Sequence, residues 1–165
     1  MIKEIFKNLI ELLDTEIGLY TQVRDLYTKK RELLVKNQVL DLAEVDTKVI
    51  EVYESIKKID LKRVDATKML GDNINCMSEL ISVAQEKCPK FVNSLKDRQV
   101  ILEKLSTSLS VLNLTNMDLI KHGMTITDKK LGIIVDVCTP KANSYNAKGI
   151  QADKQLSVST IVQDV

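Results

Sequence analysis

A heptad-like spacing of apolar residues along three long stretches constrains this chain more than any other feature of its sequence. Alternate steps of four and three residues over 2–34 reach ten positions, of which eight are apolar. The same steps give eight apolar residues in nine positions over 42–70 and ten in fourteen over 91–137. This spacing is typical of long amphipathic helices that pack along a coiled-coil seam.

Residues that break helices are scarce, because the 165 residues include only five glycines and two prolines. Asn37 is suited to end the first helix, Asp41 to cap the start of the second, and Pro89 forces a break after Cys88. The link near Asn37 is short, so the first two helices must fold back as an antiparallel hairpin. The expected helices span 2–36, 40–70, 74–87 and 91–138.

The fold class predicted from these patterns is all-α: an antiparallel helical bundle with coiled-coil character. It consists of a long helical hairpin plus a long C-terminal helix. We expect a bundle domain over residues 1–140. Residues 141–165 are rich in Asn, Ser, Lys, Gly and Gln and show no clear hydrophobic period. They predict a flexible C-terminal tail.

Charge and hydropathy narrow the location and the partners. The net charge is only +1, from 24 basic and 23 acidic residues, so no basic excess indicates nucleic-acid binding. Apolar runs are far shorter than the roughly 20 residues of a membrane span, and the start lacks a signal-peptide core. We therefore expect a cytoplasmic protein without membrane insertion. Its three cysteines, Cys76, Cys88 and Cys138, predict reduced and mostly buried small apolar residues.

The sequence contains few residue patterns that could form a catalytic or metal-binding site. The only histidine, His122, lies on a polar flank of the last helix, where a solvated side chain is the usual outcome. The Glu-x-x-His pairs of a diiron bundle and the glycine-rich phosphate and nucleotide motifs are absent from the sequence. We therefore expect no catalytic residue, metal site or cofactor, and no enzyme activity.

Two short motifs carry a family resemblance. Asn116–Ile120 resembles an Asn-x-x-Leu-Leu pattern, and Tyr145–Gly149 resembles a Tyr-x-x-x-Gly pattern about 20 residues downstream. The charged second helix, which ends in Leu70-Gly71, is similar as well. Together they resemble the flagellar export chaperone family FlgN over about residues 5–150.

The resemblance implies a stoichiometric binding protein. It implies a type III flagellar export chaperone that binds hook-associated proteins of the hook–filament junction, prevents their premature self-assembly and delivers them to the export gate. By the same resemblance, Tyr145 and Gly149 belong to the part that docks on the cytoplasmic domain of the gate. The alternative for Tyr145 is an exposed aromatic residue without a role.

The length of the last helix points to a binding surface. At 1.5 Å per residue the helices over 2–36, 40–70 and 91–138 would span about 52, 47 and 72 Å. The far end of the last helix still carries a stripe of apolar residues without an obvious partner in the chain. An unpaired stripe is a client site or an oligomer contact. The expected client-binding residues are Leu119, Ile126, Ile133 and Val137.

Alternatives stay open at three points. The chain could be a structural coiled-coil adaptor that oligomerises through its last helix, or a chaperone that forms a weak homodimer. Asn116 interrupts an apolar seam, which favours a role in setting helix register, with a family-specific contact as the other reading. Gly123 and Gly132 would either allow close packing or leave the helix end loose until a client binds.

Overall fold

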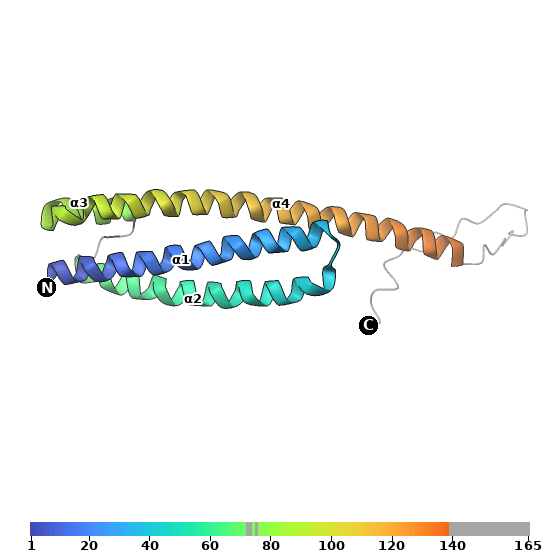
Figure 1. Cartoon of the computed structure of the whole chain (residues 1–165), viewed down its shortest axis with the longest axis horizontal. Helices are drawn as coiled ribbons and strands as arrows, with labels where there is room; N and C mark the ends of the chain where they lie inside the picture. The colour runs from blue at the N-terminus through green and yellow to red at the C-terminus, as the bar shows by residue number, and fades with distance from the viewer. Residues whose placement is uncertain (72–73, 75, 139–165) are drawn as a thin grey trace, which may run out of the picture. The chain divides into compact units, whose positions relative to one another are not determined.

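A computed structural model describes residues 1–71, 74 and 76–138 of the chain. It contains four α-helices, α1 (Ile2–Val35), α2 (Leu42–Lys68), α3 (Met77–Lys87) and α4 (Val92–Cys138), and the described residues form no strand (Figure 1). The predicted all-α class is therefore confirmed. Observed helix ends lie within about three residues of the predicted ones. The predicted tail over 141–165 lies outside the described residues.

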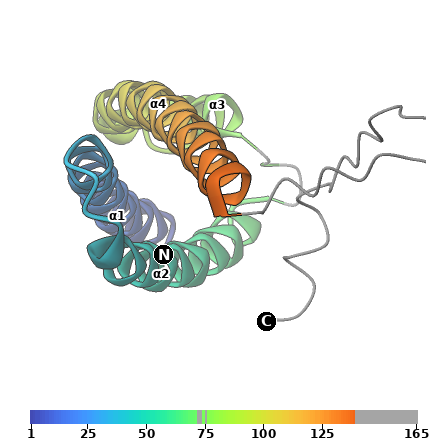
Figure 2. The same cartoon turned by 90° about the vertical axis from the view of Figure 1, so that its right-hand side faces the viewer.

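The chain divides into two compact units, Met1–Ile120 and Lys121–Val165. In the first unit, α1 and α2 run antiparallel, and the part of α4 up to Ile120 lies along them (Figure 1). Seen from the end, α1, α2 and this part of α4 surround a common interior, with α3 beside α4 (Figure 2). Of the second unit, the structure describes residues 121–138, which are helical throughout.

The hairpin between α1 and α2 is closed by a Schellman-type helix end. The Gln38 amide donates a hydrogen bond to the Leu33 carbonyl at 2.9 Å, and the Asn37 amide donates one to Leu34 at 3.2 Å. Asn37 adopts φ 55°, the left-handed conformation that asparagine tolerates better than most residues. The predicted stop at Asn37 is confirmed. Asp41 occupies the N-cap position of α2, although its carboxylate makes no capping hydrogen bond.

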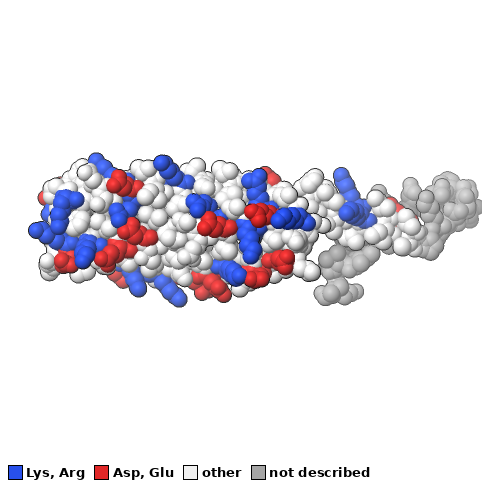
Figure 3. Space-filling model, in the orientation of Figure 1, with Lys and Arg blue, Asp and Glu red and all other residues white. Residues whose placement is uncertain are grey.

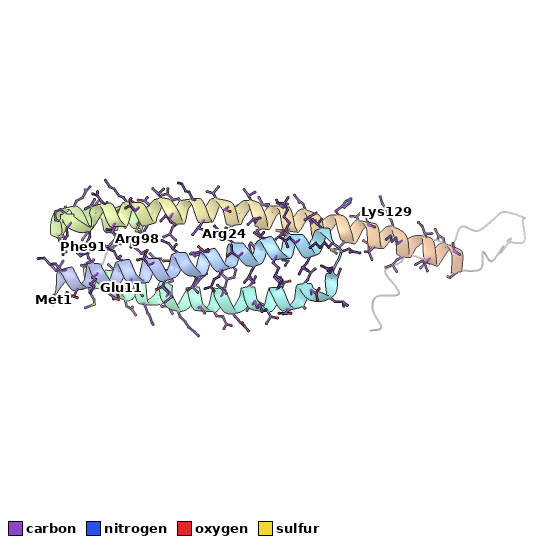
Figure 4. All side chains as sticks on the ribbon, in the orientation of Figure 1. Met1, Glu11, Arg24, Phe91, Arg98 and Lys129 are labelled. Carbon is purple, nitrogen blue, oxygen red and sulfur yellow. The ribbon has the colours of Figure 1, made fainter. Side chains whose placement is uncertain are left out.

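The largest core cluster joins all four helices at the end of the bundle that holds the N-terminus. Leu95 of α4 lies in this cluster, and the Phe6 and Phe91 rings stack with centroids 5.8 Å apart. Figure 4 labels Phe91 at this end of the bundle. The buried members are Ile5, Phe6, Leu9, Leu13, Ala66, Leu70, Leu80, Ile81, Ala84, Cys88 and Leu95. This cluster therefore fixes the start of α4 to the hairpin.

The core becomes smaller toward the hairpin turn. A second cluster contains only three buried residues, Val23, Ile56 and Leu109. The third contains Leu33, Val45 and Val49, all from the hairpin. Leu109 of α4 thus packs against both hairpin helices, whereas Val49 packs within the hairpin. The number of buried residues that attach α4 to the hairpin therefore decreases from Leu95 toward the hairpin turn.

The seam of α1 drifts away from the strict heptad pattern. Its early positions Phe6, Leu9, Leu13 and Val23 are buried as predicted, but near the turn Leu33 is buried in place of Leu34. Leu33 packs with Val45 and Val49 of α2 in the cluster next to the turn. The predicted seam position Leu34 is therefore off by one residue.

A buried ion pair crosses the α1–α2 seam. Glu16 and Arg63 both occupy seam positions, and Arg63 Nε lies 3.3 Å from Glu16 Oε2. Burial raises the pKa of the Glu16 carboxyl, and the Arg63 guanidinium opposes part of that rise. Because the two charged groups come from different helices, the pair favours one alignment of α1 against α2 over its neighbours.

Two more cross-helix pairs involve seam positions. Lys30 of α1 lies 2.6 Å from an Asp46 carboxylate oxygen of α2. Arg98 of α4, labelled in Figure 4, lies 2.7 Å from an Asp14 carboxylate oxygen of α1. Lys30 and Arg98, which interrupt the heptad pattern, are therefore contact points between helices.

The expectation that the cysteines are mostly buried is wrong. Cys88 is buried, but Cys76 and Cys138 are exposed. Cys76 directly precedes the first residue of α3, and Cys138 is the last residue of α4. Cys76 is the N-cap of α3, where its amide donates to Glu79 Oε2 at 3.2 Å in a capping box.

Candidate interaction surface on the last helix

One heptad column on α4 runs from the core to solvent. Leu105 is 7% exposed, Leu112 and Leu119 are half-buried, Ile126 is 40% exposed and Ile133 is 63% exposed. The predicted site residue Val137 is exposed too. The structure thus places Ile126, Ile133 and Val137 on accessible surface of α4, with Leu119 at its half-buried start.

The gradient reflects the loss of covering neighbours along α4. Every residue from 121 to 131 is exposed, whichever way its side chain points on the helix. On a straight α-helix a seven-residue repeat also turns by about 20° per heptad, so Ile133 lies about 80° around α4 from Leu105. A helix that keeps such a repeat calls for a partner helix that winds around it in a left-handed coil.

A second apolar row on α4 was missed by the heptad stepping. Leu131 and Ile134 are exposed, and so is Met124, whereas Ile120 is half-buried. At about 100° per residue, Ile133 and Met124 mark the two edges of an apolar half of the helix that includes both rows. A 3.6-residue period, continued from Leu95 and Leu109, would have found this row.

The opposite half of this segment is polar. It carries Lys121, His122, Asp128, Lys129 and Asp136, all of them exposed. Figure 4 labels Lys129 on this segment. In Figure 3 both signs of charge are mixed over the first unit. The segment is therefore an amphipathic helix whose apolar half faces solvent.

Asn116 is the last buried residue of α4. It is 3% exposed, and its Nδ2 donates a hydrogen bond to the Tyr27 carbonyl of α1 at 3.0 Å. Its Oδ1 is buried without a hydrogen-bond partner among the described residues. A side-chain amide on a backbone carbonyl of another helix favours one register over its neighbours. The geometry agrees with the register interpretation of Asn116, which stays a prediction.

Close packing does not explain the two glycines of this segment. A Cβ atom built on Gly123 or Gly132 would meet nothing within 4 Å among the described atoms. Each glycine disfavours the helix by about 1 kcal/mol relative to alanine. The close-packing alternative is thus contradicted for the described part of the chain.

A comparison with protein families identifies the chain. The family model described as FlgN protein matches residues 1–152. The chain belongs to the FlgN family. FlgN proteins are flagellar export chaperones that bind hook-associated proteins. Searches of curated proteins and of solved structures returned no match.

The match agrees with the bundle geometry. The described residues form a helical bundle, and exposed apolar side chains line the end of α4. Within the described residues, no group of three or more His, Cys, Asp or Glu side chains could hold a metal ion. None of the described helices is long and apolar enough to cross a membrane. His122 is exposed on the polar half of α4.

The FlgN match covers the predicted gate-docking motif, since Tyr145 and Gly149 fall within residues 1–152. Both residues lie outside the described part of the structure. Their role therefore stays a prediction from the resemblance of Tyr145–Gly149 to the Tyr-x-x-x-Gly pattern.

Proposed function

We propose that this chain is a cytoplasmic chaperone that binds one hook-associated protein through the end of α4, prevents its premature self-assembly and delivers it to the export gate. The observation that carries the proposal is the set of apolar residues Leu119, Ile126, Ile133 and Val137, which we call the client column. Members of the FlgN family bind hook-associated proteins, and this column offers an accessible apolar surface along one helix. The client would dock an amphipathic helix on this column, and no chemistry is involved.

The dimensions of the column suit one client helix. From Leu119 to Val137 it spans 18 residues, or about 27 Å at 1.5 Å per residue. That is five turns of helix, enough for a client segment to contribute several apolar residues. Covering such a stripe removes apolar area from water, which is the main favourable term in association. The same burial would shield the apolar face that the client uses for self-assembly.

The test replaces two exposed column residues with polar ones. Ile126→Asn with Ile133→Asn should weaken binding of the hook-associated client at least about tenfold, because both anchors lose apolar burial. The matched control is Val111→Asn with Leu114→Asn, two exposed residues of α4 in the first unit. Calorimetric titration measures the affinities, and circular dichroism checks that helix content is kept.

Equal losses in both double variants would contradict the proposed column. A structural adaptor that oligomerises through α4 is the other candidate function, favoured by the same exposed stripe. Light scattering separates the two. A client-free chaperone should be a monomer or weak dimer, whereas an adaptor should form a stable oligomer that the Ile126 and Ile133 changes dissociate.

The proposed division of labour assigns client binding to residues 1–140 and gate docking to residues 141–165. Tyr145→Ala should leave client affinity unchanged and weaken docking on the cytoplasmic domain of the export gate. An aromatic anchor at an interface contributes about 2 kcal/mol or more. Gly149→Val tests the second motif position in the same assay. Lost client binding with intact gate docking would reverse the two assignments.

A further inference from the structure

One lysine stands in the middle of the apolar half of α4. The neighbours of Lys130 at i−4, i+3 and i+4 are Ile126, Ile133 and Ile134, and the neighbour at i−3 is Thr127. Residues three and four apart share a helix face, so three isoleucines surround the base of the lysine side chain. Lys130 is exposed and makes no ion pair with any described residue.

The position of Lys130 matters only when the surface is covered. Along 119–138, the half of the helix between Ile133 and Met124 contains Lys130 as its single formally charged residue. A helix docked on Ile126 and Ile133 would remove the ammonium group from much of its water. A charge in such a place is stable when an opposite charge meets it and costly when it stays unpaired.

The residues next to the column are also basic. At about 100° per residue, Lys129 lies about 40° beyond Ile133, and His122 lies about 20° beyond it. The acidic residues Asp118 and Asp136 lie further round, and Asp128 is on the far side of the helix. A partner helix therefore meets lysines on both sides of its contact line.

This pattern disfavours a second copy of the chain as the partner. In an antiparallel pair of α4 segments centred on Asp128, each Lys130 would lie opposite Ile126 of the other copy. The two Lys130 charges would then be about four residues, or roughly 6 Å along the axis, apart. With the helix axes about 8–10 Å apart, the two charges are about one Debye length from each other and their repulsion is partly screened. The main cost in this register is that each ammonium group faces an isoleucine and meets no opposite charge.

We propose that the partner of this surface is an amphipathic helix of another protein whose apolar stripe is bordered by Asp or Glu, one of which pairs with Lys130. This inference rests on the proposed client site and adds the chemistry of its occupant. The net charge of the whole chain is only +1, so the preference arises locally and not from general attraction. Charge complementarity of this kind selects partners by penalising the wrong ones.

The test uses two synthetic amphipathic helices that share one set of leucine positions. One peptide carries Glu at every flanking position, and the other carries Lys. The full chain should bind the Glu peptide at least about tenfold more tightly than the Lys peptide. Lys130→Glu should reverse that order. The matched control is Lys121→Glu, which makes the same charge change on the opposite side of α4 and should leave the order unchanged.

The remaining outcomes decide between the inference and the function on which it rests. Equal affinities for the two peptides, or no binding of either, would overturn the acidic partner. The client titration with the Ile126 and Ile133 variant would still decide the proposed function by itself. A stable wild-type dimer that the same variant dissociates would make a second copy the occupant and overturn the inference.

Discussion

Replacing Leu95 by alanine tests the uneven attachment of α4. Leu95 is 0% exposed and belongs to the cluster that joins α4 to the other three helices. Leu109 is also buried, but its cluster has only two other buried residues, Val23 and Ile56. If burial and the number of packed neighbours determine the loss of unfolding free energy, Leu95→Ala and Leu109→Ala should differ although both remove the same atoms.

The expected losses follow from cavity energetics. Leu-to-Ala changes in cores cost about 2.7–5 kcal/mol, with the largest values where the site cannot collapse. Leu95→Ala belongs near the upper end, about 4–5 kcal/mol, because surrounding residues from four helices hold the cavity open. Leu109→Ala belongs near the lower end, about 2.5–3 kcal/mol. The control Ile101→Ala removes a side chain that is 43% exposed and should cost less than about 1 kcal/mol.

Urea unfolding followed by circular dichroism measures all three variants in the full chain. In a thermal scan, the change at Leu95 should lower the midpoint by about 8–20 °C, given about 2–4 °C per kcal/mol at this chain length. The order Leu95, Leu109, Ile101 is the decisive result. A loss at Leu109 equal to that at Leu95 would refute the decreasing attachment of α4 along its length.

Three further predictions address polar and backbone features. Asn116→Ala should lower the free energy of unfolding by about 1–2 kcal/mol, because it removes the bond to Tyr27 and leaves a cavity, whereas Asn116→Leu should be neutral or stabilising because an apolar side chain of similar volume replaces the amide and its unpaired Oδ1; urea unfolding distinguishes them. Burial raises the pKa of Glu16, so the folded chain holds this proton more tightly than the unfolded chain, and the contribution of Glu16 to stability is lost as pH rises from about 4.5 through the higher folded pKa; Glu16→Gln removes this contribution, so the stability of wild type minus that of the variant must fall with rising pH. Asn37→Val should cost about 1–2 kcal/mol because φ is 55° there, and Asn37→Gly should cost nothing; equal thermal midpoints for the two would contradict the left-handed cap.

The sequence predicts the helices and the first part of each seam well. Phe6, Leu13 and Val45 are buried where the heptad steps place them, since core burial is what the apolar period encodes. The steps place Leu34 on the seam in place of Leu33, because a single-helix pattern does not contain how α1 meets α2 near the turn. On α4 they pass over Leu131 and Ile134, which a period of 3.6 residues reaches.

Pairing between helices could not be predicted from the pattern. Glu16 and Arg63 are both visible as interruptions, but their contact depends on the register of α1 against α2, which a single-helix period does not contain. The same holds for Arg98 and Asp14. For the site, the column through Ile126 was found from sequence, whereas Leu131 and Ile134 were missed because they follow the other period.

The two glycines on α4 have a consequence for how tightly the chain can hold a client. Gly123 and Gly132 support no close contact among the described atoms, so their main effect is to lower the helix stability of this segment by about 2 kcal/mol together, relative to alanine. A partner that needs the segment as a helix supplies this free energy only for the fraction of free chains in which the segment is unfolded, so 2 kcal/mol corresponds to at most about a thirtyfold loss of affinity. For a protein proposed to deliver its client, a less stable helix at the binding segment favours faster dissociation of the client.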